Sequence, residues 1–156
     1  MQHDTPSSGG EPTKPLPIIS DFNRPFWEGT RRHELRLQRC SACRKYWAPN
    51  GPVCPHCFSE EYSWDQVEGR GKIAAWVVFH KVYHPAFAKD VPYNVAFIEL
   101  AEGPRIIANV VGVKNEELHV GMPVEVVFED VNDEISLPKF RKAGAPKAGH
   151  RTGTNP

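Results

Sequence analysis

Apolar and polar positions alternate along the carboxy-terminal half of the chain, in the rhythm of strands that bury one face. The longest such stretch is KIAAWVVFHKV, of which one face is expected to carry Ile73, Ala75, Val77 and Phe79. Four shorter stretches follow: YNVAFIEL, RIIANVVGV, PVEVVFEDV and EISLPKFR. Five short strands with little room for long helices predict a small closed antiparallel barrel, because closure removes exposed strand edges. We therefore expect a mainly β protein with a five-stranded OB-fold barrel over residues 67–142.

The segment before the barrel begins with a helical pattern. Asn23 can cap a helix that has Pro25 in its first turn, where a missing N–H costs nothing. Phe26 and Trp27 fall on one side of this short helix, which should end at about His33. The aromatic pair either packs against its own domain or anchors a partner, since aromatic residues are enriched at interfaces. The run LRLQRC then alternates like a strand.

Both ends of the 156-residue chain differ in composition from its centre. Residues 1–17 and 143–156 are rich in Pro, Gly, Ser and Thr, so we expect two disordered tails. Between them we expect a helix and metal-binding ribbon over 18–66, followed by the barrel over 67–142. The first residues lack the basic start and apolar run of a secretory signal, and no stretch has the roughly 18 apolar residues that span a bilayer. We expect a cytoplasmic protein.

All four cysteines lie in RCSACRKYWAPNGPVCPHC, as the pairs Cys40 with Cys43 and Cys54 with Cys57. Each Cys-x-x-Cys turn lets two sulfurs converge on one metal ion, and the turn-rich APNGPV connection folds the second pair over the first. The pattern predicts a zinc ribbon with one zinc per chain. Four thiolates leave no open coordination position, so the zinc should be structural, and its binding free energy of about 10 kcal/mol becomes folding free energy.

Other uses of the thiols fit the sequence less well. A thioredoxin-type dithiol needs only one such pair, and disulfides are disfavoured in a reducing cytoplasm. Iron in the same cage, as in rubredoxin, and His33 or His56 as a replacement ligand are the remaining alternatives for the metal site.

Basic residues surround the first cysteine pair, with Glu34 as the single acidic neighbour in that stretch. Part of this charge should offset the negative charge of a zinc tetrathiolate. Any surplus would form an anion site for the phosphates of a nucleotide-like ligand or for an acidic patch on a partner. The candidates for such a site are Arg31, Arg32 and Arg36.

Aromatic residues and histidines gather in FHKVYHPAFAKDVPY, which should form the loop that joins the first two barrel strands. The loop is either a solvated connection or a rigid, partly apolar binding surface. Its candidate binding residues are His80, Tyr83, His84, Phe87 and Tyr93.

We expect no catalytic residue in this chain. The metal uses all four thiols, and the sequence has no glycine-rich phosphate loop, no Gly-x-Ser-x-Gly and no His-Glu-x-x-His. The remaining acid–base candidates are His80 and His84 with Asp90 or Glu99. These four residues lack a nucleophile to activate.

The order of PFWEG, LQRCSACRKYWAPNGPVCPHC, GRGKIAAWVVFH, HPAF, PYNVAFIEL, GPRIIANVVGV and LPKFR resembles an OB-fold family with an N-terminal rubredoxin-like zinc ribbon. This family is associated with acyl-CoA metabolism, and the resemblance covers roughly residues 20–142. It implies a non-catalytic accessory subunit of a thiolase or thiolase-like enzyme in a hetero-oligomer. Partners in the family include lipid-transfer-protein type aldolases of steroid side-chain breakdown, thiolases of aromatic degradation and acyl-CoA hydratases. The resemblance also implies that CoA or acyl-CoA is shared with the partner.

One departure from the family pattern lies next to the metal ligands. The position after the second cysteine of such knuckles is often glycine, and here it is Arg44 and Phe58. If a positive φ is required there, these residues strain the turns.

Two rival functions make different demands on the sequence. A zinc ribbon with an OB-fold is also a nucleic-acid-binding architecture, but 19 basic residues balance 19 acidic ones. EVVFEDVNDE moreover places five carboxylates and no basic residue in the last third of the barrel, namely Glu125, Glu129, Asp130, Asp133 and Glu134. We therefore expect no nucleic acid and no membrane as partner. A rubredoxin-like electron carrier would instead contain iron and be red.

Overall fold

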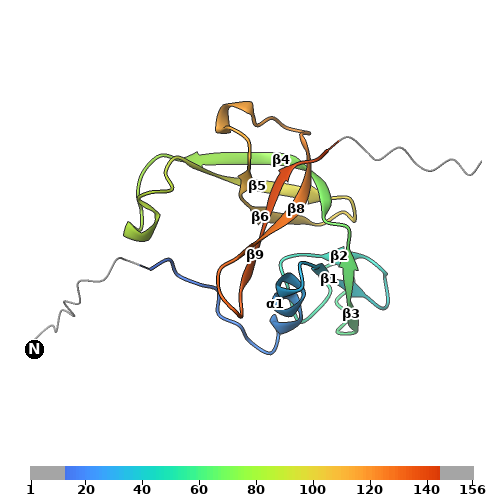
Figure 1. Ribbon diagram of the computed structural model, residues 1–156. Coiled ribbons are helices and arrows are strands. Elements are labelled where there is room, and N and C mark those ends of the chain that lie inside the picture. The colour runs from blue at the N-terminus through green and yellow to red at the C-terminus, as the bar shows by residue number, and fades with distance from the viewer. Residues whose placement is uncertain (1–12, 145–156) are drawn as a thin grey trace, which may run out of the picture.

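The computed structural model describes residues 13–144, so the two expected tails lie mostly outside the described residues. The fold is mainly β, as predicted (Figure 1). No helix among residues 13–144 is both long and apolar enough to cross a membrane.

The amino-terminal lobe contains one helix and a three-stranded sheet. Helix α1 spans Arg24–Arg31 and ends two residues before the predicted end. The sheet has the order β2-β1-β3 and is antiparallel, with bounds β1 Leu35–Cys40, β2 Tyr46–Trp47 and β3 Tyr62–Val67. Asn23 lies at the N-cap position, but its side chain makes no cap hydrogen bond to the helix. Its Oδ1 instead accepts from the N–H of Ser20 at 2.8 Å, so the predicted capping role of Asn23 is wrong.

The second sheet carries the predicted OB-fold, in the strand order β6-β5-β4-β8-β9-β7. Its strands are β4 Arg70–Phe79, β5 Tyr93–Leu100, β6 Arg105–Ala108, β7 Val110–Val111, β8 Pro123–Asp130 and β9 Ser136–Lys142. Two short 3₁₀ helices, Pro85–Phe87 and Asn115–Glu117, lie in the connections. All pairs are antiparallel except β7 with β9.

The predicted closure of the barrel is wrong. The predicted single strand RIIANVVGV is interrupted at Asn109, and its two parts, β6 and β7, form opposite edges of the curled sheet without pairing to each other. A side chain compensates at this break. The amide of Asn94 donates to the C=O of Val110 at 2.8 Å and accepts from the N–H of Val110 at 2.7 Å. Asn94 is only 5% exposed. Its amide therefore takes the place of a neighbouring strand and satisfies the N–H and C=O of Val110, which water cannot reach.

The predicted division of β4 into two faces is also wrong. The pairing of β4 with β5 shifts between Ile73 and Ala75, which is a β-bulge. An extra residue reverses the side of every later side chain. Ile73 is therefore buried, whereas Ala75 and Val77, which were expected on the same face, are exposed.

One apolar core joins the two lobes. Leu35 and Leu37 of β1 belong to the same buried cluster as Ile73, Ile98 and Phe140 of the second sheet. The expected boundary between residues 66 and 67 lies at the end of β3, next to this shared core. The ribbon and the OB-fold therefore stabilise each other by burying common apolar surface.

A histidine links the end of α1 to β8. His33 has φ +57°, and its Nε2 lies 2.8 Å from Oδ1 of Asp130. Its ring stacks on Phe128, with centroids 5.2 Å apart. The hydrogen bond from His33 is the largest cause that lowers the pKa of Asp130. His33, which the sequence offered as an alternative metal ligand, therefore contacts β8 instead.

Gly69→Ala should destabilise the protein strongly. Gly69 joins β3 to β4 with φ +68°, and a Cβ there would lie 2.2 Å from Cγ1 of Val126. Left-handed strain and overpacking together predict a loss of about 2 to 5 kcal/mol in the free energy of unfolding. Gly121→Ala is the matched control, since Gly121 has φ +84° with nothing within 4 Å of its Cβ position, and it should lose only about 1 to 2 kcal/mol. Equal losses in urea denaturation would contradict the packing argument.

Candidate functional site

The four cysteine sulfurs meet at one point of the ribbon. All four Sγ atoms lie within 4.8 Å of one another. The Sγ–Sγ distance is 3.6 Å for Cys40 with Cys57 and also 3.6 Å for Cys43 with Cys54. A tetrahedral zinc with Zn–S bonds of about 2.3 Å separates its sulfurs by about 3.8 Å. The four thiols therefore fit a single zinc ion, which would hold the two turns together and has no open coordination position.

Backbone hydrogen bonds shape both turns in the same way. The N–H of Arg44 donates to the C=O of Cys40 at 3.0 Å, and the N–H of Phe58 donates to the C=O of Cys54 at 2.9 Å. Arg44 has φ +65° and Phe58 has φ +62°. The positive φ that the sequence left open is therefore present in both turns, at residues that favour it far less than glycine does.

The protonation of the thiols is uneven. The backbone N–H of Cys43, which donates to Sγ of Cys40 at 3.4 Å, is the largest cause that lowers the pKa of Cys40 to about 6. The backbone N–H of Ser59 lowers the pKa of Cys57, but the contact with Cys40, loss of hydration and the other thiols outweigh it and raise that pKa to about 11. One thiolate is thus favoured at the expense of another, and a divalent cation would relieve this competition.

The alternative histidine ligands are not part of this cluster. The sulfur group holds only the four cysteines, and Nε2 of His33 contacts Asp130 instead. His56 contributes its backbone N–H, which donates to Sγ of Cys54 at 3.4 Å.

One carboxylate offsets part of the charge of the three candidate arginines. Nη2 of Arg36 lies 2.8 Å from Oε2 of Glu34, and Nε of Arg32 lies 3.6 Å from the same oxygen. The hydrogen bond from Arg36 is the largest cause that lowers the pKa of Glu34. Arg31 is exposed at the end of α1 and has no ion pair among residues 13–144. Of the three candidate arginines, Arg31 is therefore the one without an ion pair.

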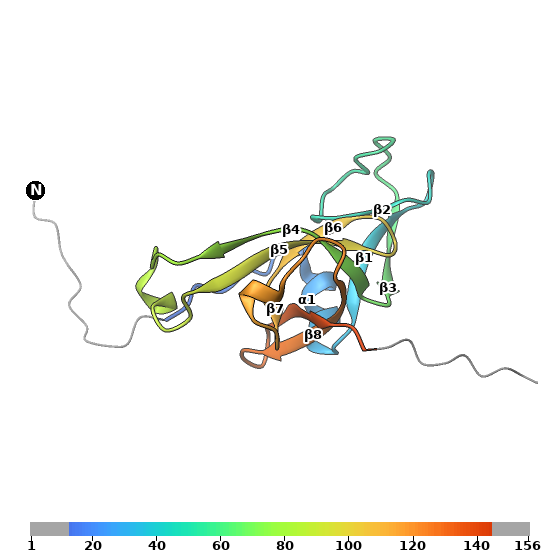
Figure 2. The same cartoon turned by 90° about the horizontal axis from the view of Figure 1, so that it is seen from above.

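The predicted binding loop closes the end of a long hairpin. Figure 2 shows that the hairpin of β4 and β5 extends away from the ribbon. The aromatic side chains of the loop lie together, since Phe79 stacks on Tyr93 at 5.2 Å, and Phe87 lies 6.0 Å from Tyr93 and 5.9 Å from His84. Tyr83 is 72% exposed, and its ring meets that of Phe79 edge-on at 6.1 Å. His80 is exposed and takes no part in these ring contacts within the described chain.

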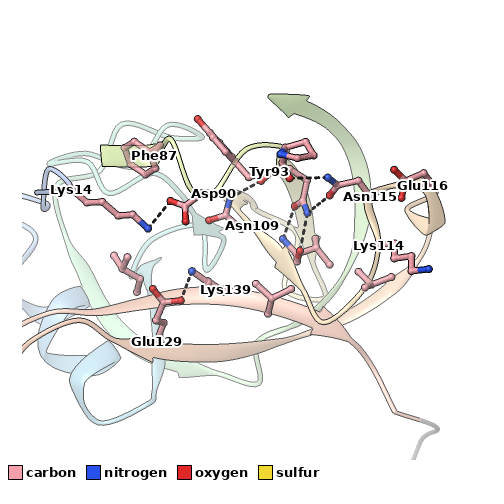
Figure 3. Close-up of a pocket in the computed structure, with 16 residues that line it drawn as sticks. Lys14, Phe87, Asp90, Tyr93, Asn109, Lys114, Asn115, Glu116, Glu129 and Lys139 are labelled. Carbon is pink, nitrogen blue, oxygen red and sulfur yellow. Dashed lines mark hydrogen bonds and ion pairs between the residues drawn. The ribbon is translucent and has the colours of Figure 1, made fainter. Parts of the chain in front are cut away.

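A cavity of about 630 Å³ lies beside this loop (Figure 3). Phe87, Asp90 and Tyr93 line it from the hairpin, while Glu129 and Lys139 line it from β8 and β9. Four of its charged side chains form two pairs: Nζ of Lys14 lies 2.6 Å from Oδ2 of Asp90, and Lys139 contacts Glu129. Lys114 and Glu116 also line the cavity. Three asparagines bond to one another and to the backbone along its floor. The cavity offers polar contacts but no nucleophile paired with a base.

The other candidate pair, Phe26 and Trp27, lines an apolar groove of about 570 Å³ between α1 and the sheet. The two rings meet edge-on at 5.0 Å, and Phe26 packs against the shared core. Sequence reasoning missed the opposite wall, which Phe97 of β5 and Ile107 of β6 form. These side chains are 47% and 63% exposed. The sequence did contain a signal for this wall. In YNVAFIEL both alternating sets of positions carry apolar residues, so the face of the strand that points away from the core is apolar as well.

Comparison with known proteins assigns both parts of this architecture to one family. The rubredoxin-like zinc ribbon domain of ChsH2 matches residues 27–63, and the C-terminal OB-fold domain of ChsH2 matches residues 64–129. A solved structure described as "Ltp2-ChsH2(DUF35) aldolase" contains a chain that is 37% identical, with a TM-score of 0.73 over 81% of this chain and 98% of that one. The chain belongs to the ChsH2 family. The predicted family and fold are thereby confirmed.

Proteins similar to this chain differ in length and in name. A protein of Thermomonospora curvata named "Probable enoyl-CoA hydratase alpha subunit" is 40% identical over 132 residues, which cover 83% of this chain and 40% of that protein. A "DUF35 domain-containing scaffold protein" of Methanocaldococcus jannaschii is 36% identical over 62% of this chain and 68% of the relative. This chain therefore spans well under half of the hydratase subunit and about two thirds of the scaffold protein.

Freshly purified protein should contain one zinc per chain by elemental analysis. Cys43→Ser or Cys57→Ser should remove a ligand, lower the zinc content and give insoluble or partly unfolded protein. Acidification should release zinc, because protons compete for the thiolates that bind it. Ser41→Ala, in the same turn but outside the ligand set, is the control and should keep its zinc. Iron in place of zinc would support the rubredoxin alternative, and the absence of both would contradict the metal site.

Proposed function

We propose that this chain is a non-catalytic, zinc-stabilised accessory subunit of a thiolase-like enzyme that acts on acyl-CoA. The observation that carries the proposal is its likeness over 98% of the ChsH2 chain in the Ltp2–ChsH2 aldolase structure. The partner we propose is accordingly an aldolase of the Ltp2 type, bound in a hetero-oligomer. A relative named as a scaffold protein supports a role in assembly.

The chemistry of the described residues supports a role without catalysis. Every cysteine belongs to the metal cluster. Three of the four acid–base candidates have partners: Nδ1 of His84 accepts from the N–H of Ala86, Asp90 pairs with Lys14, and Glu99 pairs with Lys72 and Arg105. The fourth, His80, is exposed. A nucleophile held by a base, as covalent catalysis needs, is not found among residues 13–144.

Two surfaces are suited to contact the enzyme. One is the aromatic end of the β4–β5 hairpin, where the exposed ring of Tyr83 meets Phe79 edge-on. The other is the groove between α1 and the sheet, where Phe26 and Trp27 face Phe97 and Ile107. Partly exposed apolar side chains on rigid elements are typical of protein interfaces.

CoA handling would fall to the basic side of the ribbon. Because Glu34 already pairs with Arg32 and Arg36, we propose Arg31 as the residue that meets a CoA phosphate. The cavity beside the hairpin is less suited, because three carboxylates line it together with its three lysines, and two of these lysines, Lys14 and Lys139, are paired. The carboxylates of this cavity, Asp90, Glu116 and Glu129, also disfavour the binding of a nucleic-acid backbone at this side of the OB-fold.

The isolated chain should catalyse neither acyl transfer nor carbon–carbon cleavage. An Ltp2-type aldolase from the same organism should bind it and lose stability or turnover when it is removed. Calorimetric titration of the two proteins and a steady-state assay of the aldolase with and without this chain measure both effects. CoA should tighten the complex of the parent chain but not that of Arg31→Glu. Cleavage or condensation of acyl-CoA by the chain alone would overturn the proposal, as would failure to bind the aldolase.

Tyr83→Ala should weaken the complex by about 1 to 3 kcal/mol if the ring is an anchor, without unfolding the chain, because Tyr83 is largely exposed. Phe87→Ala should act in the same direction but also loosen the loop, since Phe87 packs on Tyr93 and His84. Val120→Ala removes an equally exposed apolar side chain from the segment before β8 and should change nothing. Parental affinity and turnover of both aromatic variants would make the hairpin end a solvated connection.

A further inference from the structure

Strand β6 has a free edge, and this edge borders the apolar groove beside α1. β6 is the outermost strand in the order β6-β5-β4-β8-β9-β7, so it has a neighbour on one side only. Consecutive residues of β6, namely Arg105, Ile106 and Ile107, line the groove, which therefore runs along the strand. An unpaired strand edge is a template on which another extended chain can pair.

The pairing of β6 with β5 determines which of its backbone groups are free. The N–H of Leu100 donates to the C=O of Pro104 at 2.9 Å, so these residues form a hydrogen-bonded pair of the antiparallel ladder. Such pairs alternate with non-hydrogen-bonded pairs along the ladder. The register then makes Arg105 and Ile107 the non-hydrogen-bonded positions of β6. Their backbone N–H and C=O groups point away from β5 and have no partner among residues 13–144.

The groove continues toward the zinc ribbon. A second cavity of about 570 Å³ lies between residues 102–104, directly before β6, and residues 44–48 of the ribbon. Ala48 lines both cavities, so together they form one cleft between residues 102–107 and 44–50. Figure 2 shows β2 and β6 side by side at this cleft. β2 is an outermost strand of the ribbon sheet, so the cleft lies between edge strands of the two sheets.

The cleft is apolar beside α1 and basic beside the ribbon. Arg44 and Lys45 line its ribbon end, are exposed, and make no ion pair among residues 13–144. Arg105 adds a third cation, and Glu102 is the only carboxylate among the described residues that line the cleft. A zinc tetrathiolate would offset part of this charge, but none of its cysteines lines the cleft. The walls therefore favour an occupant that is apolar at one end and acidic at the other.

We propose that this cleft receives an extended segment of the thiolase-like enzyme, which adds as a strand to the free edge of β6. The inference rests on the proposed function and specifies how the groove binds the enzyme. The segment carries apolar side chains at alternate positions beside α1 and acidic side chains where it passes Arg44 and Lys45. In strand addition of this kind, main-chain hydrogen bonds supply affinity, and the contacts of alternate side chains supply specificity.

No segment of this chain fits the cleft as well. Residues 145–156 contain two cationic side chains and no carboxylate side chain, and their apolar residues are only alanine and proline. Residues 1–12 contain one large apolar side chain, Met1. A strand that enters between two walls must also be free on both of its edges, whereas every strand among residues 13–144 already pairs with a neighbour. A second copy is therefore a poorer occupant than a partner segment that belongs to no sheet.

The test places proline where a backbone N–H points out of a sheet. Ile107→Pro removes the free N–H but no hydrogen bond to β5, and edge strands tolerate proline. It should raise the Kd for the Ltp2-type aldolase about tenfold or more, because the lost N–H and the added ring both block pairing. Ile107→Val keeps the N–H and an apolar β-branched side chain, so it should bind like the parent.

Gln66→Pro is the matched control. The N–H of Ser41 donates to the C=O of Glu61, so by the same alternation the N–H of Gln66 points out of β3, away from β1. Gln66 is exposed on the opposite edge of the ribbon sheet and does not line the cleft. Gln66→Pro should therefore leave the Kd unchanged.

Hydrogen exchange of the parent chain gives a second measurement that needs no variant. The amide of Ile107 should exchange rapidly in the free chain and become protected in the complex with the aldolase. The amide of Gln66 should exchange rapidly in both states. A protected Ile107 amide identifies main-chain pairing, which side-chain docking in the same groove would not produce.

The possible failures are distinguishable. If the parent does not bind the aldolase, the proposed function fails and this inference falls with it. If the parent binds while the Ile107 amide stays unprotected, or Ile107→Pro binds within twofold of the parent, only the strand site is overturned. Equal weakening by Gln66→Pro or by Ile107→Val also overturns it, as a general effect of proline or of side-chain packing. Sedimentation that shows a dimer of the parent, lost in Ile107→Pro, would assign the edge to a second copy and overturn it as well.

Discussion

Convergence of four sulfurs between two short turns is the constraint on which this structure depends. A structural zinc supplies about 10 kcal/mol of folding free energy, which is comparable to the burial of several large apolar side chains. With the turns fixed, β1, which ends at Cys40, pairs with β3 in a defined register and presents Leu35 and Leu37 to the OB-fold. The metal thus stabilises the second lobe as well, because these leucines complete its core. The geometry of the groove beside α1 depends on the same chain of contacts.

Local pattern was sufficient for most of the fold. Alternation located the strands, and turn residues separated them, because both signals lie within a few neighbouring residues. The bulge after Ile73 escaped prediction since it is set by pairing with β5, and it then reversed the assignment of Ala75 and Val77. The break at Asn109 was missed for a similar reason: the chain there changes its pairing partner from β5 to β9, and hydropathy does not record partners.

The same distinction holds for the site. Spacing alone located the metal ligands, because two Cys-x-x-Cys turns have few other uses. The pairing of Glu34 with Arg36 was not foreseen, although the two residues stand two apart on an extended chain and share a face. Phe97 and Ile107 become visible as a groove wall only when α1 folds over the sheet. A feature that forms only when two elements meet in space, such as this groove, could therefore not be predicted from the sequence.

Asn94 has a consequence for the redesign of this fold. Its amide both donates to and accepts from the backbone of Val110, which no other side chain of its length can do. Aspartate lacks the donor, serine and threonine are too short, and glutamine would overshoot. The point at which the chain leaves one strand for the next is therefore encoded by a single amide group. An engineer who wishes to lengthen β6 by one residue, or to widen the curled sheet, must relocate that amide together with the break.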